Sequence, residues 1–473
     1  MILVEMNLNE LLAGQPPVNH IPDARRKIRQ HLLDSRKRLV VIDDDPTGPQ
    51  AIHDVRVFMD WSVDTLRKAF RTNDPVFFVC TNSRSLSPAD AVKVSLEAGQ
   101  NLRDAAEQEK VEILLTSRSD STLRGHFPAE LDALISGRGT KPDGIILIPA
   151  FFEGGRYTID DIHYAEQDSE MVPVHLTEFA RDPAYSYQNS NLKKWVEEKT
   201  GGSVKAKNVH SVSLETLRKG GPEAVVEQLM QASETTVFIA NAACYEDLEI
   251  LTLGIIEAEG KGKCFAYRCS ASFIKARGGF EDRPLLTHTE LTPGNTPGLI
   301  LVGSYVDKTS KQLQRLLDSG LAEGIELRIE QLGQKETKVR EIQAVFDYVN
   351  QMLGKGKNTV IYTSREIQTN SERNFSETGS LIMQSFCSVV RNVDIKPGWI
   401  IAKGGITSIQ VAKTALDANE AFAIGQILPG VPVWRLFEKA RWTDIPYVVF
   451  PGNVGDEDAL LRVVRVMKGL FGE

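Results

Sequence analysis

Residues 39–48 read LVVIDDDPTG, an apolar run that ends in three carboxylates and a turn. Consecutive apolar residues before a turn are typical of a strand that is buried on both faces of a parallel sheet. In open α/β sheets, ligands bind just beyond the carboxyl ends of the strands. Three acidic side chains crowded at such a point are costly unless a ligand, a metal or a base uses them. The segment therefore predicts both a parallel sheet and the position of a functional site.

This acidic segment fits two chemistries. Asp43-x-Asp45-x-Thr47 is the nucleophile pattern of haloacid-dehalogenase-type phosphatases, with Asp43 as nucleophile and Asp45 as acid and base. Read from Asp44, the same stretch has the pattern DDxTG, which is a different motif. Motifs this short arise easily by chance, so the rest of the chain has to decide between the two patterns. The strand-end hydroxyl and the metal-binding acids of a phosphatase would come from Thr116 or Thr363 and from Asp456 and Asp458.

Composition indicates a two-domain protein of the cell interior. At 473 residues the chain is too long for one ordinary hydrophobic core. A formal charge of −8 argues against nucleic-acid binding, although local arginines can still bind small anions. The five scattered cysteines suit a reducing compartment without disulfides. No apolar run approaches ~18 residues, and the N-terminus lacks the basic start of a signal peptide, so we expect a cytoplasmic protein without a membrane partner.

Short β-rich runs alternate with helical patterns along the chain, apart from a polar, aromatic-rich insert over about 151–208. The alternation predicts an α/β protein of two domains, each a largely parallel β-sheet flanked by helices. Predicted strands lie at 55–59, 76–80, 113–116, 145–149, 237–241, 264–267, 299–303, 359–363, 399–402, 421–424 and 447–450, with a long helix over 88–109. Glycines and prolines cluster over 278–298, which divides the chain into an N-terminal arm (1–37), a first domain (38–285), a linker (286–298) and a second domain (299–473).

Polar loops follow three predicted strands of the first domain. Besides the acidic segment, Asn82 and Arg84 follow the strand at 76–80, and DSTLRG at 120–125 follows the strand at 113–116. Arginine binds a carboxylate or phosphate with two parallel hydrogen bonds, while Asp and Ser match the hydroxyls of a polyol. These loops predict a site for a small hydroxylated acid, and Arg156, beside two glycines, is a further anion contact. Asp160, Asp161 and His163 in the insert are more typical of a polar surface loop than of a metal site.

Glycine turns follow the predicted strands of the second domain. Gly404 and Gly405 lie between a strand and a helix start, where free N–H groups can bind phosphate. The loop at 303–309 resembles a P-loop without its second glycine, so a Walker A site is rejected. Several such turns at strand ends favour a nucleotide. The turn residues that we assign to it are Gly303, Ser304, Thr309, Lys403, Gly404, Gly405, Thr407, Gly430 and Gly452.

In this order, the segments resemble the four-carbon acid sugar kinase family, once described as a domain of unknown function. The similarity covers nearly the whole chain from about residue 38, and DSTLRG is its most specific run. The accompanying motifs are DDxTG at 44–48, NxR at 82–84, GRxT at 155–158, GGxT at 404–407 and PGxxG at 451–455. The chain departs from the family pattern at Arg118, His126 and Ile406, where members often carry Lys, Asn and an acid.

The resemblance implies a sugar-acid-binding N-terminal domain and a nucleotide-binding C-terminal domain. It implies a kinase that uses ATP and Mg²⁺ to phosphorylate the terminal hydroxyl of a four-carbon acid sugar, such as threonate, erythronate or 3-oxo-tetronate. Asp44 or Asp45 would be catalytic. The substrate would be bound by Asn82, Arg84, Asp120, Ser121, Arg124 and Arg156. The expected partners are the acid sugar and ATP, with a homodimer left open, and a non-catalytic sugar-acid sensor is the third alternative.

Overall fold

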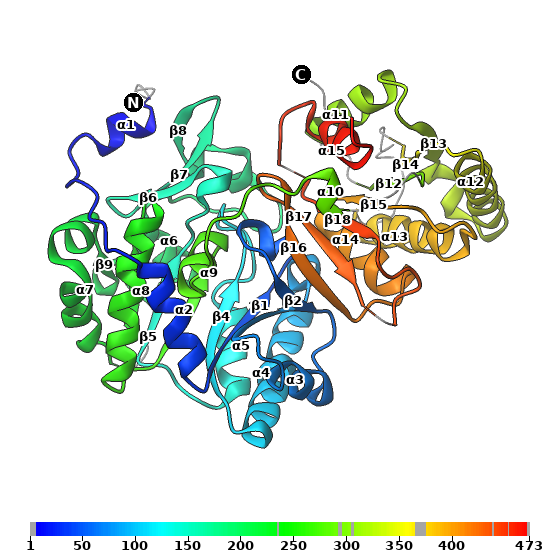
Figure 1. Cartoon of the computed structure of the whole chain (residues 1–473). Helices are drawn as coiled ribbons and strands as arrows, with labels where there is room; N and C mark the ends of the chain where they lie inside the picture. The colour runs from blue at the N-terminus through cyan, green and yellow to red at the C-terminus, as the bar shows by residue number, and fades with distance from the viewer. Residues whose placement is uncertain are drawn as a thin grey trace. The chain divides into compact units, whose positions relative to one another are not determined.

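The computed structural model describes residues 6–233, 236–291, 296–303, 307–364, 375–437, 439–452 and 454–470. The chain divides into two compact units, Met1–Asp282 and Arg283–Glu473. Each unit contains a mostly parallel β-sheet with helices packed against it (Figure 1). The predicted fold class, two α/β domains, is therefore confirmed.

The sheet of the first unit is built around β1 (Lys37–Asp43), the strand that the apolar run at 39–42 predicts. Its order is β2-β3-β1-β4-β11-β5-β10-β9, and all these pairings are parallel. The chain leaves β1 toward one side to form β2 and β3 and returns on the other side as β4, so β1 borders a topological switch point. The other strands are β2 (Val55–Phe58), β3 (Val76–Cys80), β4 (Glu112–Arg118), β5 (Gly144–Ile148), β9 (His210–Val212), β10 (Thr236–Ala240) and β11 (Phe265–Cys269).

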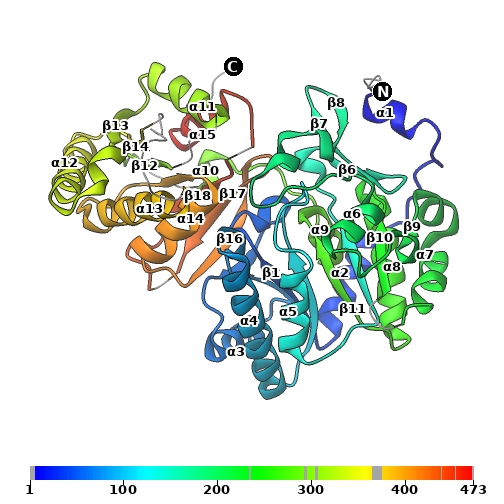
Figure 2. The ribbon, with the colours of Figure 1, turned by 180° about the vertical axis from the view of Figure 1, so that it is seen from behind.

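Helices cover both faces of this sheet, as Figures 1 and 2 show. On one face, α3 (Val63–Phe70), α4 (Pro88–Glu109) and α5 (Ala129–Arg138) pack on apolar side chains of β1, β3 and β4. Ser87 caps α4 by accepting a hydrogen bond from the Asp90 N–H, as expected for Ser before Pro. The remaining helices of the unit are α1 (Leu8–Leu12), α2 (Ala24–Asp34), α6 (Leu192–Lys199), α7 (Leu214–Met230), α8 (Tyr245–Gly260) and α9 (Ala271–Arg277).

Two segments outside the regular alternation also belong to the first unit. Helix α2, within the predicted N-terminal arm, buries Ile28 and Leu32 completely and packs on α8 and α9. The insert forms an antiparallel sheet of β6 (Arg156–Ile159), β7 (Ile162–Gln167) and β8 (Glu170–Pro173), followed by short 3₁₀ turns that include η5 (Glu178–Arg181). Sequence periodicity does not reveal β6–β8, because these strands are short and half-exposed.

The sheet of the second unit has the order β13-β14-β12-β15-β18-β17-β16. Its first five strands are parallel, and β17 pairs antiparallel with both β18 and β16. Helices α10, α11 and α15 bury one face, and α12 contacts β13 and β14. The strands are β12 (Leu299–Val302), β13 (Glu323–Leu327), β14 (Thr359–Thr363), β15 (Ile400–Lys403), β16 (Glu420–Leu428), β17 (Val431–Leu436) and β18 (Pro446–Phe450). The helices are α10 (His288–Leu291), α11 (Asp307–Asp318), α12 (Lys335–Gly354), α13 (Phe375–Asn392), α14 (Gly405–Gln410) and α15 (Ala459–Met467).

The predicted linker at 286–298 is packed where the structure describes it. Leu286 and Leu291 join the hydrophobic core of the second unit, and the Leu286 N–H donates to the Gln426 carbonyl over 2.7 Å. Residues 292–295 of that linker lie outside the described residues. Among the described helices, none is long and apolar enough to cross a membrane.

Two helix glycines generate the first prediction. A Cβ added at Gly99 of α4 would lie 2.5 Å from the Leu134 carbonyl oxygen, and one added at Gly137 of α5 would overlap the Leu96 carbonyl oxygen. In a helix, Gly→Ala ordinarily stabilises by about 1 kcal/mol. Here the added methyl meets backbone, so we expect Gly99→Ala and Gly137→Ala each to lower the free energy of unfolding by about 1–3 kcal/mol in urea titrations.

Gly260→Ala is the matched control. Gly260 ends α8 in the same unit, and a Cβ added there would have nothing within 4 Å. We expect this variant to unfold at the same or a higher urea concentration. If Gly99→Ala and Gly137→Ala behaved like Gly260→Ala, the close crossing of α4 and α5 would be incorrect.

Candidate functional site

The first acid of the cluster, Asp43, is a buried structural residue. It ends β1 at 1% exposure, and Arg118, at the register-matched end of β4, donates to its Oδ1 over 3.2 Å. A Cβ added at Gly48 would overlap Asp43 Oδ2, so only glycine fits the turn beneath this carboxylate. Burial raises the pKa of Asp43 to about 7, although Arg118 acts in the opposite direction. A covered carboxylate in this position has no open approach for a phosphoryl group, which argues against Asp43 as a nucleophile.

Asp44 is buried and fully engaged by its neighbours. Its side chain is 1% exposed, and Arg84 donates to both carboxylate oxygens, through Nη2 and through Nε at 3.2 Å. The Ser119 hydroxyl donates to Oδ2 as well. With these contacts, Asp44 fixes the guanidinium of Arg84 at the carboxyl end of β1.

Arg84 also faces two further carboxylates. Its Nη1 lies 3.6 Å from Asp45 Oδ2 and 3.9 Å from Asp120 Oδ1. Asp45 is 17% exposed, the most accessible of the three acids at the end of β1, and its Oδ1 accepts a hydrogen bond of 2.8 Å from the Thr47 N–H. Asp120 accepts from Arg124 Nε over 2.7 Å and from the Thr122 hydroxyl. One arginine therefore joins three of the predicted site carboxylates.

The charges around Arg84 keep Asp45 and Asp120 ionised. Burial alone would raise the pKa of Asp45, but Arg84, Arg118 and the hydrogen bonds from Thr47 outweigh it, so the pKa is lowered. Burial likewise opposes ionisation of Asp120, and Arg124 and Arg84 outweigh it and hold its pKa far below the ordinary value. This region therefore presents fixed negative charge and hydrogen-bond acceptors at neutral pH.

Arg156, the first residue of β6, forms no salt bridge with a described carboxylate, and neither does Arg268 on β11. The buried Nε of Arg156 has no hydrogen-bond partner among the described residues. Burial lowers its pKa, while Asp120 nearby acts in the opposite direction. Its guanidinium lies 5.7 Å from the centre of the Phe179 ring, and that of Arg124 lies 5.1 Å from the same ring. A half-buried arginine without a salt bridge is an arrangement suited to binding an anion.

The other two predicted substrate residues lie in the same loops with their contacts partly used. Asn82, 8% exposed and at φ 53°, donates from Nδ2 to Ser85 Oγ over 2.8 Å and shapes the turn that carries Arg84. Ser121 is 8% exposed, and its carbonyl accepts from His163 Nε2 over 2.7 Å. Asn82, Arg84, Asp120, Ser121, Arg124 and Arg156 are thus brought into one region of the first unit.

Several residues of this region carry no sequence signal of their own. Glu130, on α5, accepts from the Ser83 hydroxyl, and burial followed by repulsion from Asp44 raises its pKa to about 7. Arg268, at 5% exposure on β11, donates to the Arg124 carbonyl over 3.3 Å. The Tyr185 hydroxyl donates to the Arg84 carbonyl. Each of them contacts a residue far away along the chain, such as Ser83 for Glu130, and only the fold brings these pairs together.

The glycine turns of the second unit meet at one edge of its sheet. Strands β12, β15 and β18 are parallel neighbours with Val302, Lys403 and Phe450 in register, so Gly303, Gly404 and Gly452 follow adjacent strand ends. A Cβ added at Gly303 would lie 2.5 Å from Thr407 Oγ1, which brings the first loop against the diglycine loop. The Thr309 hydroxyl donates to the Gly452 carbonyl over 3.3 Å. Gly405 begins α14, where the first N–H groups have no partner within the helix.

Lys403, the last residue of β15, hydrogen-bonds the loop after β18 at this edge of the sheet. Its side chain is fully buried, and Nζ donates to the Pro451 carbonyl over 2.7 Å and to the Gly452 carbonyl over 3.4 Å. Nζ also lies 4.1 Å from the centre of the Phe450 ring. Burial, followed by repulsion from Lys308, lowers the pKa of Lys403 to about 7. The residue therefore ties the loop after β18 to the end of β15.

Two predicted nucleotide residues do not join this cluster in the structure. Ser304 lies outside the described residues. Gly430 forms the turn of the β16–β17 hairpin, with φ 76°. Since β16 and β18 run in the same direction, this turn lies at the same edge as Gly452, but β17 separates them by about 10 Å.

The described residues contain no group of three His, Cys, Asp or Glu side chains that could hold a metal ion. His163 is fully buried, with Nε2 bonded to the Ser121 carbonyl and Nδ1 2.9 Å from the Thr158 hydroxyl. Asp161 accepts hydrogen bonds from Ser211 and Asn241.

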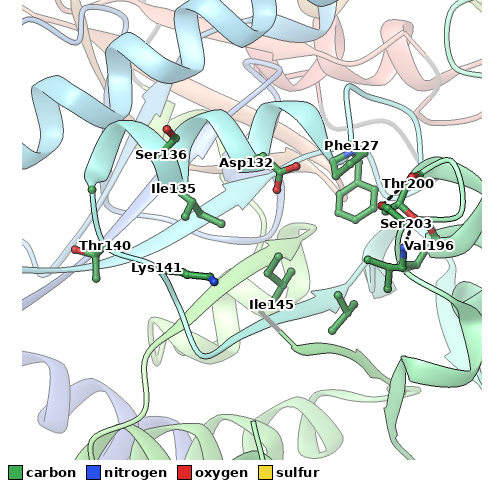
Figure 3. Close-up of a pocket in the computed structure, with 14 residues that line it drawn as sticks. Phe127, Asp132, Ile135, Ser136, Thr140, Lys141, Ile145, Val196, Thr200 and Ser203 are labelled. Atoms are coloured by element: carbon green, nitrogen blue, oxygen red, sulfur yellow. Dashed lines mark hydrogen bonds between the residues drawn. The ribbon is translucent and has the colours of Figure 1, made fainter. Parts of the chain in front are cut away.

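An open pocket of about 480 Å³ beside α5 and β5 is lined mostly by apolar groups such as Ile135, Ile145 and Val196 (Figure 3). None of the predicted site residues lines it.

With this geometry established, the chain can be compared with known proteins. The model of a sugar-binding N-terminal domain matches residues 39–277, and that of a nucleotide-binding C-terminal domain matches residues 299–460. The chain belongs to the four-carbon acid sugar kinase family, as the sequence motifs predict.

Individual relatives are distant but cover most of the chain. D-erythronate kinase of Heliobacterium modesticaldum is 24% identical over 456 residues, which is 90% of this chain and 96% of that protein. Two solved structures share the fold. A Salmonella typhimurium LT2 protein has a TM-score of 0.64 and 17% identity, and the match covers 90% of this chain and 98% of that one. A Haemophilus influenzae protein of family DUF1537 has a TM-score of 0.60 and 18% identity, and the match covers 90% of this chain and 100% of that one.

The charge cluster generates the second prediction. Replacing Arg84 by Met leaves buried carboxylates without their shared cation, so we expect a loss of about 3–5 kcal/mol in the free energy of unfolding at pH 7. The lowered pKa values of Asp45 and Asp120 contribute stability above the ordinary pKa of about 4, and that contribution is lost as the pH falls toward their folded values. The difference between wild type and Arg84→Met should therefore be largest near neutral pH and shrink below about pH 4.

Arg26→Met is the control, because Arg26 forms a surface ion pair with Asp23 at 78% exposure. We expect it to change the free energy of unfolding by less than about 0.5 kcal/mol at every pH. An Arg84→Met effect that grew as the pH fell would contradict the assigned ionisation of Asp45 and Asp120.

Proposed function

We propose that the protein is an ATP-dependent kinase that phosphorylates the terminal hydroxyl of a small, four-carbon acid sugar such as a tetronate or oxo-tetronate. Family membership and the relative named D-erythronate kinase support the reaction class. The structural observation that carries the proposal is Arg156, a half-buried cation without a salt bridge to a described carboxylate, in the same region as the ionised acids Asp45 and Asp120. An unpaired cation next to hydrogen-bond acceptors matches a molecule with one carboxylate and several hydroxyls.

In this proposal the first unit holds the acid sugar. Arg156 and Arg124, whose guanidinium groups both lie near the Phe179 ring, bind the substrate carboxylate. Asp45 then orients the attacking hydroxyl, because Asp44 is 1% exposed and already bonded to Arg84 and Ser119. Phosphoryl transfer needs little proton removal before the transition state, so an aspartate with a lowered pKa can serve by positioning the hydroxyl.

The second unit would bind ATP at the edge formed by Gly303, Gly404, Gly405 and Gly452. Backbone N–H groups at the start of α14 suit phosphate oxygens, and Lys403 holds the loop after β18 in place. Mg²⁺ would neutralise charge on the phosphates. In such sites Mg²⁺ is bound by the ATP phosphates, by water molecules and by one or two carboxylates. A cytoplasmic location, where ATP and Mg²⁺ are abundant, goes with this proposal.

The direct test is ATP turnover by the purified full-length chain with C4 to C6 aldonates and their oxo forms. The proposal expects ADP release that depends on a four-carbon acid and yields its phosphate ester. Release of inorganic phosphate from a sugar phosphate without ATP would favour the phosphatase alternative. Binding of acid sugars without any turnover would favour a sensor.

Arg156→Gln generates the third prediction. It removes the cation and leaves a shorter polar side chain, so KM for the acid sugar should rise about 10- to 100-fold, the equivalent of a lost charged hydrogen bond. KM for ATP should change by less than about twofold. Arg181→Gln, an exposed arginine of the same insert, is the control and should behave like wild type. An unchanged acid-sugar KM in Arg156→Gln would remove Arg156 from the site.

The two aspartates generate the fourth prediction. Asp45→Asn should lower kcat by about 10²-fold or more, because the reacting hydroxyl loses a charged acceptor and retains only the weaker amide oxygen. Asp44→Asn removes the charge that fixes Arg84, so it should lower the free energy of unfolding more than Asp45→Asn does. Kinetics and urea unfolding of both variants separate the roles. Full ATP-dependent activity in both would contradict the assignment of either carboxylate.

A further inference from the structure

One short segment of the insert contacts all three arginines of the predicted sugar-acid site. It comprises η5 (Glu178–Arg181) and the turn that follows it to Tyr185, and we call it the 178–185 segment. The Phe179 ring lies against Arg124 and Arg156, and the Tyr185 hydroxyl donates to the Arg84 carbonyl. No motif in this stretch distinguishes it in the sequence.

The 178–185 segment is anchored to the loop that carries Asp120 and Arg124. Tyr187, 3% exposed, donates from its backbone N–H to the Ala180 carbonyl over 3.1 Å and from its hydroxyl to the Thr122 carbonyl over 2.8 Å. Asp182 Oδ2 lies 3.5 Å from Arg124 Nη1. The segment and the loop at 120–125 are thus held in one arrangement, which fixes where Phe179 stands.

The Phe179 ring contacts two positively charged side chains, those of Arg124 and Arg156. This partly buried ring has the Arg124 guanidinium 5.1 Å and the Arg156 guanidinium 5.7 Å from its centre. Arg124 is already directed by Asp120, through Nε at 2.7 Å, whereas Arg156 has no carboxylate to direct it. Guanidinium groups are attracted to an aromatic face, so the ring stabilises both cations and limits their rotamers.

We propose that Phe179 is a positioning residue that sets specificity for a carboxylated substrate by holding Arg124 and Arg156 ready to bind one carboxylate together. The inference rests on the proposed function. It adds that the preference for an acid over a neutral polyol depends on an aromatic side chain that need not hydrogen-bond the substrate. Pre-ordering two long side chains reduces the entropy lost on binding, so the effect belongs to substrate affinity and not to the chemical step.

The test compares Phe179→Leu and Phe179→Met with Phe179→Tyr in the full-length protein, using D-erythronate as the probe. Calorimetry without ATP and steady-state kinetics give two readouts. We expect Kd and KM for D-erythronate to rise about tenfold in the Leu and Met variants, with kcat and KM for ATP within about twofold of wild type. Phe179→Tyr keeps the aromatic face and should restore wild-type affinity. Leu176→Ala, at a 37% exposed residue of the same insert, is the control and should be silent.

The outcomes separate this inference from the proposed function. If wild type neither binds nor phosphorylates any C4 to C6 acid sugar, the proposed function fails. If wild type is active and a folded Leu or Met variant keeps its D-erythronate affinity, the role of Phe179 is overturned. A fall in kcat together with a rise in KM for ATP would also overturn it, because that pattern marks a general structural defect. Having both Leu and Met variants keeps the test decisive if one of them does not fold.

Discussion

The site in the first unit depends on a single buried interaction, the contact of Arg84 with three carboxylates. Without it, the side chains of Asp44, Asp45 and Asp120 would repel one another at the end of a parallel sheet. The sheet places them there, because β1 and β4 are neighbours whose loops leave the same edge at a topological switch point. Both carboxylate oxygens of Asp44 accept hydrogen bonds from Arg84, so Asp45 is the more accessible acid.

The surroundings of the acidic segment argue against covalent chemistry at Asp43. Asp43, the residue that a phosphatase would need as its nucleophile, is enclosed by Arg118 and Gly48. The neighbouring Arg156 forms no salt bridge with a described carboxylate, and in the proposed function it binds the substrate anion. In the second unit Lys403 holds the loop after β18, and in the proposed function the backbone N–H groups at the start of α14 bind phosphate.

The sequence predicts the parts of this structure that depend on local pattern. The run at 39–42 becomes β1, and Ser87-Pro88 marks the start of α4, because buried strands and helix caps have signatures within a few residues. The grouping of the predicted substrate residues follows from parallel strands sharing an edge. Contacts over long distances along the chain could not be predicted: Glu130 meets Ser83 across 47 positions, and Phe179 sits in a short 3₁₀ turn without periodicity. For the same reason the pattern could not rank Asp45 above Asp44.

The most direct test of this account is a crystal structure of the protein with D-erythronate bound. The account predicts the substrate carboxylate within hydrogen-bond distance of Arg156, and the terminal hydroxyl within hydrogen-bond distance of Asp45, with the contact between Arg84 and Asp44 intact. A carboxylate bound to Arg84 in place of Asp44, or an acid sugar bound only in the second unit, would contradict it.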